Sequence, residues 1–147
     1  MRTVNRILLA ASLSLPVALA SLDLRAEMVW EQDRVTTLAE DLARELSLLL
    51  EAARSGPQQD TAMQQRTRDA ALTVLRRTHE NAERLATMLR EGNGHFATEG
   101  QFEAVKQGMV QALKTAKNAV AQPGAREHLA AAQDVRAELS MYYAAGA

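Results

Sequence analysis

The sequence predicts an all-α protein that folds as an antiparallel up-down-up-down four-helix bundle behind an N-terminal signal peptide. Aromatic residues make up only 3% of the 147 residues, and strand-forming residues are scarce beside alanine, leucine, glutamine, glutamate and arginine. Apolar residues recur every three or four positions through four segments, as they do along one face of an amphipathic helix. Glycine-containing breaks separate the segments, and amphipathic helices with short connections typically pack as such a bundle.

The N-terminus has the layout of a secretory signal peptide. Two arginines precede an uncharged run, residues 7–20, which ends in the small residues Ala18-Leu19-Ala20 of a cleavage site. A second candidate cleavage site follows Ala26. We expect residues 1–20 to be removed and residues 27–147 to form a single helical-bundle domain. The uncharged run is shorter than the roughly 20 residues that a membrane-spanning helix needs, and no later segment is a candidate for one.

The cysteine content and the net charge limit the compartment in which we expect the protein and the class of partner that we expect it to bind. The chain has no cysteine, so it has no disulfide, thiolate metal site or covalently attached haem. We expect an exported protein of this kind in the periplasm, where its hydrophobic core alone has to stabilise it. A formal net charge of −1 does not favour nucleic acid as a partner.

The first two helices are predicted from about Met28 to Arg54 and from about Pro57 to Glu91. The apolar face of the first helix consists of Val35, Leu38, Leu42, Leu46, Leu49 and Ala53. This helix ends at Ser55-Gly56-Pro57, because glycine favours the position after a helix and proline cannot continue one. The apolar face of the second helix consists of Met63, Ala70, Val74, Thr78, Ala82, Leu85 and Leu89, with Ala71, Leu75 and Met88 alongside. Gly92-Asn93-Gly94 then ends it.

The third helix is predicted to begin at Thr98, which has the Thr-x-x-Gln spacing of a capping box with Gln101. Its apolar face consists of Phe102, Val105, Met109, Leu113, Ala116 and Val120. Gln122-Pro123-Gly124 separates it from the fourth helix. The apolar face of the fourth helix consists of Ala125, Leu129, Ala132, Val135 or Arg136, Leu139 and Tyr143. We expect the first two helices to be longer than the last two by a turn or more.

The residue patterns of known catalytic sites are missing from the sequence. His79, His95 and His128 fall at different levels of the predicted bundle, so no two of them can share a metal ion or a haem. The sequence has no Glu-x-x-His di-iron motif, no glycine-rich phosphate loop after a strand and no nucleophile elbow. We therefore expect no catalytic activity, no metal site and no bound cofactor.

One group of residues is a candidate binding site. The start of the first helix, the 92–94 break and the end of the fourth helix meet at one end of the predicted bundle. Aromatic, methionine and histidine residues gather at this end: Met28, Trp30, His95, Phe96, Phe102, Met141, Tyr142 and Tyr143. Such residues are enriched at binding surfaces, so we expect a protein partner, including a second copy of the chain, or a small apolar ligand. The alternative is a hydrophobic cap that closes this end.

The sequence also resembles the soluble periplasmic b-type cytochromes, which are exported four-helix bundles of this size. The similar residues are Thr37-Leu38, Leu42, Gly108, Ala112-Leu113-Lys114, Arg136 and Tyr143. The resemblance implies the bundle fold and, as an alternative function, electron transfer by a haem b between a methionine and a histidine. The corresponding positions are Val35 and Ser140, neither of which can ligate iron in that way. A haem would need a shifted ligand set drawn from Met28, His95 and Met141.

Overall fold

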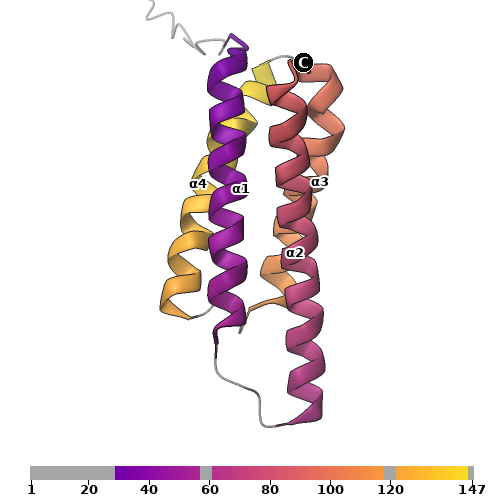
Figure 1. The fold of residues 1–147 in the computed structure, drawn as a ribbon, viewed down its shortest axis with the longest axis vertical. Helices are drawn as coiled ribbons and strands as arrows, with labels where there is room; N and C mark the ends of the chain where they lie inside the picture. The colour runs from indigo at the N-terminus through magenta and orange to yellow at the C-terminus, as the bar shows by residue number, and fades with distance from the viewer. Residues whose placement is uncertain (1–28, 57–60, 118–121, 146–147) are drawn as a thin grey trace, which may run out of the picture.

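The computed structural model describes residues 29–56, 61–117 and 122–145, and these residues form four α-helices and no strand (Figure 1). The helices are α1 (Gln32–Arg54), α2 (Ala62–Arg90), α3 (His95–Thr115) and α4 (Pro123–Ala145). The all-α prediction is thus confirmed for the described residues. The predicted signal peptide and both cleavage sites lie outside them. Within those three segments, no helix is both long enough and apolar enough to cross a membrane.

The four helices lie side by side with their long axes roughly aligned (Figure 1). α1 packs along both α2 and α4, and α2 also packs along α3, whereas the backbones of α3 and α4 come close at few points. Hydrogen bonds join the start of one helix to the end of another. Gln32 donates to the Leu89 carbonyl, and Arg68 donates to the Arg54 carbonyl. The bundle is therefore tightly packed on three sides and open between α3 and α4.

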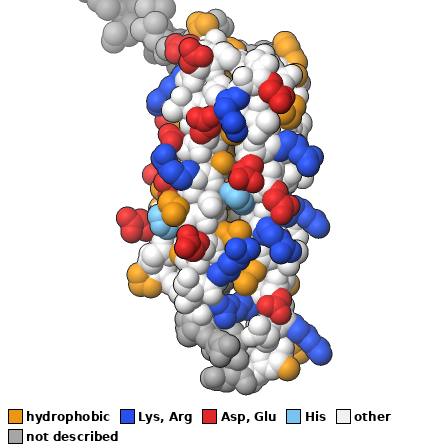
Figure 2. Space-filling view, viewed as in Figure 1, with side chains coloured by type: hydrophobic (Ala, Val, Ile, Leu, Met, Phe, Trp, Pro, Cys, Tyr) orange, Lys and Arg blue, Asp and Glu red, His pale blue; other side chains and the backbone are white. Residues whose placement is uncertain are grey.

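The core is centred on α1, whose predicted apolar face is buried in full. Each buried leucine contributes about 1.5–3 kcal/mol relative to an exposed one. Buried alanines of the other helices belong to the same core, and their small side chains allow close helix packing: Ala71, Ala82, Ala86, Ala125 and Ala132. On the face shown in Figure 2, acidic and basic side chains are interspersed, so this face has no large field of one sign.

The first part of α2 differs from the prediction. Met63 and Ala70 are exposed, whereas Ala71 and Leu75, which were predicted alongside the apolar face, are buried. Met63 is exposed because the first turns of α2 extend beyond the ends of the other helices, where no neighbour covers them (Figure 1). Ala70 is exposed because it lies on a different side of the helix from its covered neighbour Ala71. With 29 residues α2 is the longest helix, but α1 and α4 both have 23, so the expected extra length is wrong for α1.

The predicted capping box at Thr98 and Gln101 is also wrong. The capping box lies at the start of α2, where Thr61 and Gln64 exchange hydrogen bonds. α3 begins earlier than predicted, at His95. Thr98 and Gln101 have partners on other helices, since the Thr98 hydroxyl bonds the Tyr143 hydroxyl and the Gln101 amide donates to the Asn81 carbonyl.

Helices α2 and α3 approach closely at Gly108. A Cβ atom at Gly108 would lie 2.5 Å from Thr78 Oγ1 and 3.1 Å from Thr78 Cγ2. Thr78 is buried, and its hydroxyl donates to the Val74 carbonyl, so its side chain has little freedom to move away. Gly108 is therefore the residue that sets the spacing of the two helices here.

Replacing Gly108 with alanine is expected to lower the free energy of unfolding by about 1–3 kcal/mol, because the added methyl group overpacks the contact with Thr78. Gly100 is the matched control, since it lies on the same helix and a Cβ atom there would meet nothing within 4 Å. Gly100→Ala should stabilise the helix by about 0.5–1 kcal/mol. Urea denaturation measures both effects. Equal stabilisation by the two variants would contradict the close approach.

Candidate binding site at the aromatic end

Five rings from distant parts of the sequence meet where α1 begins, α2 turns into α3 and α4 ends. This aromatic cluster consists of Trp30, His95, Phe96, Phe102 and Tyr143. Phe102 stacks on Tyr143 with ring centroids 4.3 Å apart. Trp30 meets the rings of His95 and Tyr143 edge to face at 5.3 and 5.2 Å. Such arrangements stabilise beyond the burial of area alone.

The segment before α1 is tied to the end of α2. The Trp30 indole donates to the Gln32 side-chain oxygen at 2.9 Å. The Gln32 amide in turn donates to the carbonyls of Leu89 at 2.8 Å and Asn93 at 3.1 Å. Gly92 makes the turn between α2 and α3 with a φ of 84°, a conformation that glycine adopts without strain. These contacts place Trp30 against the first residue of α3.

Two buried hydrogen bonds hold the end of α4 against the start of α3. His95 Nε2 donates to the Tyr143 carbonyl at 2.9 Å, and the Thr98 and Tyr143 hydroxyls are 2.8 Å apart. The other ring nitrogen of His95, Nδ1, is buried and has no hydrogen-bond partner among the described residues. Burial raises the pKa of the Tyr143 hydroxyl, and the bond to Thr98 opposes this in part.

Stability is expected to fall at alkaline pH through Tyr143. Below about pH 10 the phenol is protonated in both states, so its contribution is complete. Above that pH the unfolded chain releases the proton first, and the free energy of unfolding decreases as pH rises. Tyr143→Phe should remove the decrease in the free energy of unfolding that Tyr143 causes at alkaline pH. The variant also loses the hydrogen bond to Thr98, which lowers the free energy of unfolding by about 0.5–1.5 kcal/mol at neutral pH. Urea denaturation as a function of pH measures both, and an unchanged alkaline slope would contradict the assignment.

The predicted site residues separate into a buried group and an exposed group. Phe102, Tyr142, Tyr143 and His95 are buried, and Trp30 is half-buried. Phe96 is 81% exposed, Met141 is 50% exposed, and Val29, which precedes Trp30 in the sequence, is 75% exposed. We call Val29, Phe96 and Met141 the exposed rim. Met28 lies outside the described residues.

The residues around the expected haem-ligand positions do not fit a haem. Val35 is fully buried in the core, and the Ser140 hydroxyl donates to the Arg136 carbonyl. His95 Nε2 is bonded to a carbonyl, and the rings of Trp30, Phe96 and Tyr143 surround the imidazole with centroids at 5.0–5.3 Å. A porphyrin could reach this histidine only if these rings separated.

The other two histidines belong to separate surface contacts. His128 on α4 lies 2.9 Å from a Glu45 carboxylate oxygen on α1, and His79 lies 3.5 Å from Glu83 on its own helix. In the described segments, no three or more histidines, aspartates or glutamates come together in a way that could hold a metal ion.

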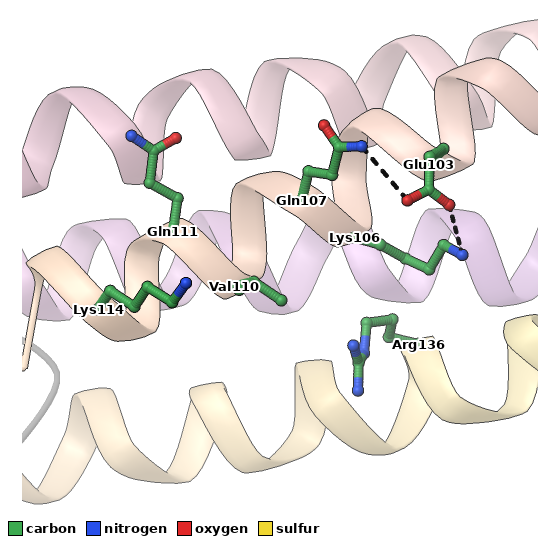
Figure 3. Close-up of a pocket in the computed structure, with 7 residues that line it drawn as sticks. All are labelled: Glu103, Lys106, Gln107, Val110, Gln111, Lys114 and Arg136. Atoms are coloured by element: carbon green, nitrogen blue, oxygen red, sulfur yellow. Dashed lines mark hydrogen bonds and ion pairs between the residues drawn. The ribbon is translucent and has the colours of Figure 1, made fainter.

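The sequence did not predict two features. Val29 belongs to the exposed rim, but it precedes the part of α1 in which apolar residues recur periodically, so no sequence pattern predicted its role. A groove of about 430 Å³ runs between α3 and α4, with Lys106, Val110 and Lys114 on one wall and Arg136 on the other (Figure 3). The apolar faces of these two helices contain several alanines, which is a weak signal that they pack less fully than α1.

Comparisons with models of protein families, with curated proteins and with solved structures found no match to this chain.

Proposed function

We propose that this chain is an exported, periplasmic helical-bundle protein without catalytic activity that binds a protein partner through the exposed rim. The observation that carries the proposal is the exposure of Val29, Phe96 and Met141 beside a cluster of packed rings at one end of the bundle. Apolar and aromatic side chains gathered on a surface are typical of interaction sites. The predicted signal peptide supports export, and the hydrogen bonds between helix starts and ends support the up-down-up-down antiparallel order.

The packing favours a protein partner over a small apolar ligand. The rings of the cluster fill one another's space, and the cavity beside Phe102 and Tyr143 measures only about 160 Å³. Pockets for small molecules usually measure about 300–1,000 Å³. Phe96 instead presents its ring outward, where a flat or concave protein surface can cover it. The partner is either another protein or a second copy of this chain.

Site-specific photo-crosslinking in intact cells tests the proposal. A photoreactive phenylalanine analogue at Phe96 should give a discrete adduct, because the partner covers this ring. Met63 is the matched control, since it is a large apolar side chain, 72% exposed, at the other end of the bundle. The mass of the Phe96 adduct distinguishes a second copy from another protein. No adduct, or the same adducts from both positions, would contradict the proposal.

The alternative function, a haem b electron carrier, rests on the sequence resemblance. It predicts a Soret band in protein purified from haem-sufficient cells. Because rings crowd His95 and its Nε2 is bonded to Tyr143, we expect no Soret band and no uptake of added haem. An absorbance spectrum followed by a haem titration checks this. A band that is lost in His95→Ala or Met141→Ala would replace the binding proposal with the electron carrier.

A further inference from the structure

Helices α3 and α4 are adjacent in the bundle but do not pack along their lengths, unlike the three other adjacent pairs. The groove between them has a volume of about 430 Å³. Figure 3 shows Lys106, Val110 and Lys114 of α3 on the side toward α4, and Arg136 reaching from α4 into the same space. Val110 is partly exposed at the middle of the groove. The groove thus has an apolar centre with basic side chains around it.

Basic side chains in the groove outnumber acidic ones. Among the described residues of the lining, Glu103 is the one carboxylate, and it already pairs with Lys106. Lys114 and Arg136 form no ion pair with a carboxylate in the part of the chain that the structure describes. Two positive charges of the groove are therefore left without a negative partner.

The guanidinium of Arg136 is also short of a hydrogen-bond acceptor. Its Nε atom is buried and has no partner among the described residues. The Ser140 hydroxyl donates to the backbone carbonyl of Arg136, so this bond gives the guanidinium no acceptor. Buried guanidinium N–H groups are normally paired, most strongly with a carboxylate. A carboxylate from another molecule cannot reach the buried Nε, but the terminal amino groups of the same guanidinium also form no ion pair among the described residues and are the groups that such a carboxylate would bond.

We propose that the α3–α4 groove binds an acidic amphipathic helix of a partner protein. An apolar side chain of that helix would cover Val110, and its carboxylates would pair with Lys114 and Arg136. A groove between two helices has the shape that receives a third helix. The charge of the lining disfavours the same groove of a second copy, since like charges would face each other. This surface differs from the exposed rim, so the proposal stands or fails independently of it.

Two synthetic helical peptides test the proposal against the purified, exported chain. Both carry the same leucine stripe, and their polar positions are glutamate in one and lysine in the other. Fluorescence anisotropy should show binding of the glutamate peptide and none of the lysine peptide. Arg136→Gln and Lys114→Gln should each weaken binding about tenfold, the loss of one charged hydrogen bond. Arg84→Gln, on the exposed face of α2, is the matched control and should leave the affinity unchanged.

Further variants separate a local effect from a loss of fold. Val110→Asp changes a side chain that is already exposed, so the bundle should fold while binding of the glutamate peptide is lost. Phe96→Ser should leave peptide binding intact, because Phe96 belongs to the exposed rim. Failure of the glutamate peptide to bind, equal binding of both peptides, or full affinity in Arg136→Gln and Lys114→Gln would overturn the proposal.

Discussion

Replacing Phe102 with alanine is expected to lower the free energy of unfolding by about 3–5 kcal/mol, as for other large buried aromatic residues. Phe102 is 1% exposed and stacks on Tyr143 at 4.3 Å, so truncation removes the ring contact and leaves a cavity where α3 meets the end of α4. Part of the loss comes from the rings themselves, since such pairs contribute about 0.5–1.5 kcal/mol beyond their buried area. Urea denaturation followed by circular dichroism measures the change.

Phe96→Ala is the control for this prediction. Phe96 is the same residue type on the same helix and belongs to the same cluster, but its ring is largely exposed. Its truncation should change the free energy of unfolding by no more than about 0.5 kcal/mol. Similar losses in the two variants would contradict the finding that Phe102 lies in the buried part of the aromatic cluster and Phe96 in the exposed rim.

Replacing Phe96 with serine is expected to have the largest effect on partner binding. Aromatic residues at the centre of an interface often contribute 2 kcal/mol or more, which corresponds to an affinity loss of about thirtyfold or greater. An adduct formed from a photoreactive residue at Val29 reports this loss, because Val29 lies at the same end and the probe leaves Phe96 free to vary. The adduct should therefore nearly disappear in Phe96→Ser while the protein remains folded.

Leu48→Ser provides the comparison for the binding effect. Leu48 is an apolar side chain exposed on α1, away from the exposed rim, and its replacement should leave the Val29 adduct at the level of the unchanged chain. If Phe96→Ser leaves the adduct unchanged, or if Leu48→Ser removes it equally well, Phe96 is not part of the interface.

The local pattern was enough to predict the helices and the end at which the aromatic residues meet. The apolar stripe of α1 is periodic from Val35 to Ala53, and such periodicity depends only on neighbouring residues. The glycine-containing breaks then determine which helix ends lie together, and so bring Trp30, His95 and Tyr143 into contact. Phe96 and Phe102 are six residues apart on α3. The helical repeat turns the second about 120° away from the first, so the sequence was enough to predict that the two rings lie on different faces of the helix.

The features that the sequence did not predict depend on distances between helices. The Thr-x-x-Gln pattern occurs at both Thr61 and Thr98, and the second is not a cap because α3 already begins at His95, which places Thr98 inside the helix. Exposure of Met63 depends on how far α2 extends past its neighbours. The groove beside Arg136 likewise reflects the separation of α3 and α4, which no pattern within one helix contains.

Methionine oxidation in intact cells tests the central claim, that a partner covers the aromatic end, most directly. The oxidation rate follows solvent exposure, and the chain offers an exposed methionine at each end, Met141 and Met63, with Met109 buried between them. In purified protein, hydrogen peroxide should oxidise Met63 and Met141 but not Met109. In intact cells, a bound partner should slow the oxidation of Met141 several-fold and leave the oxidation rate of Met63 unchanged. Equal rates for Met141 in cells and in purified protein would contradict the proposed interface.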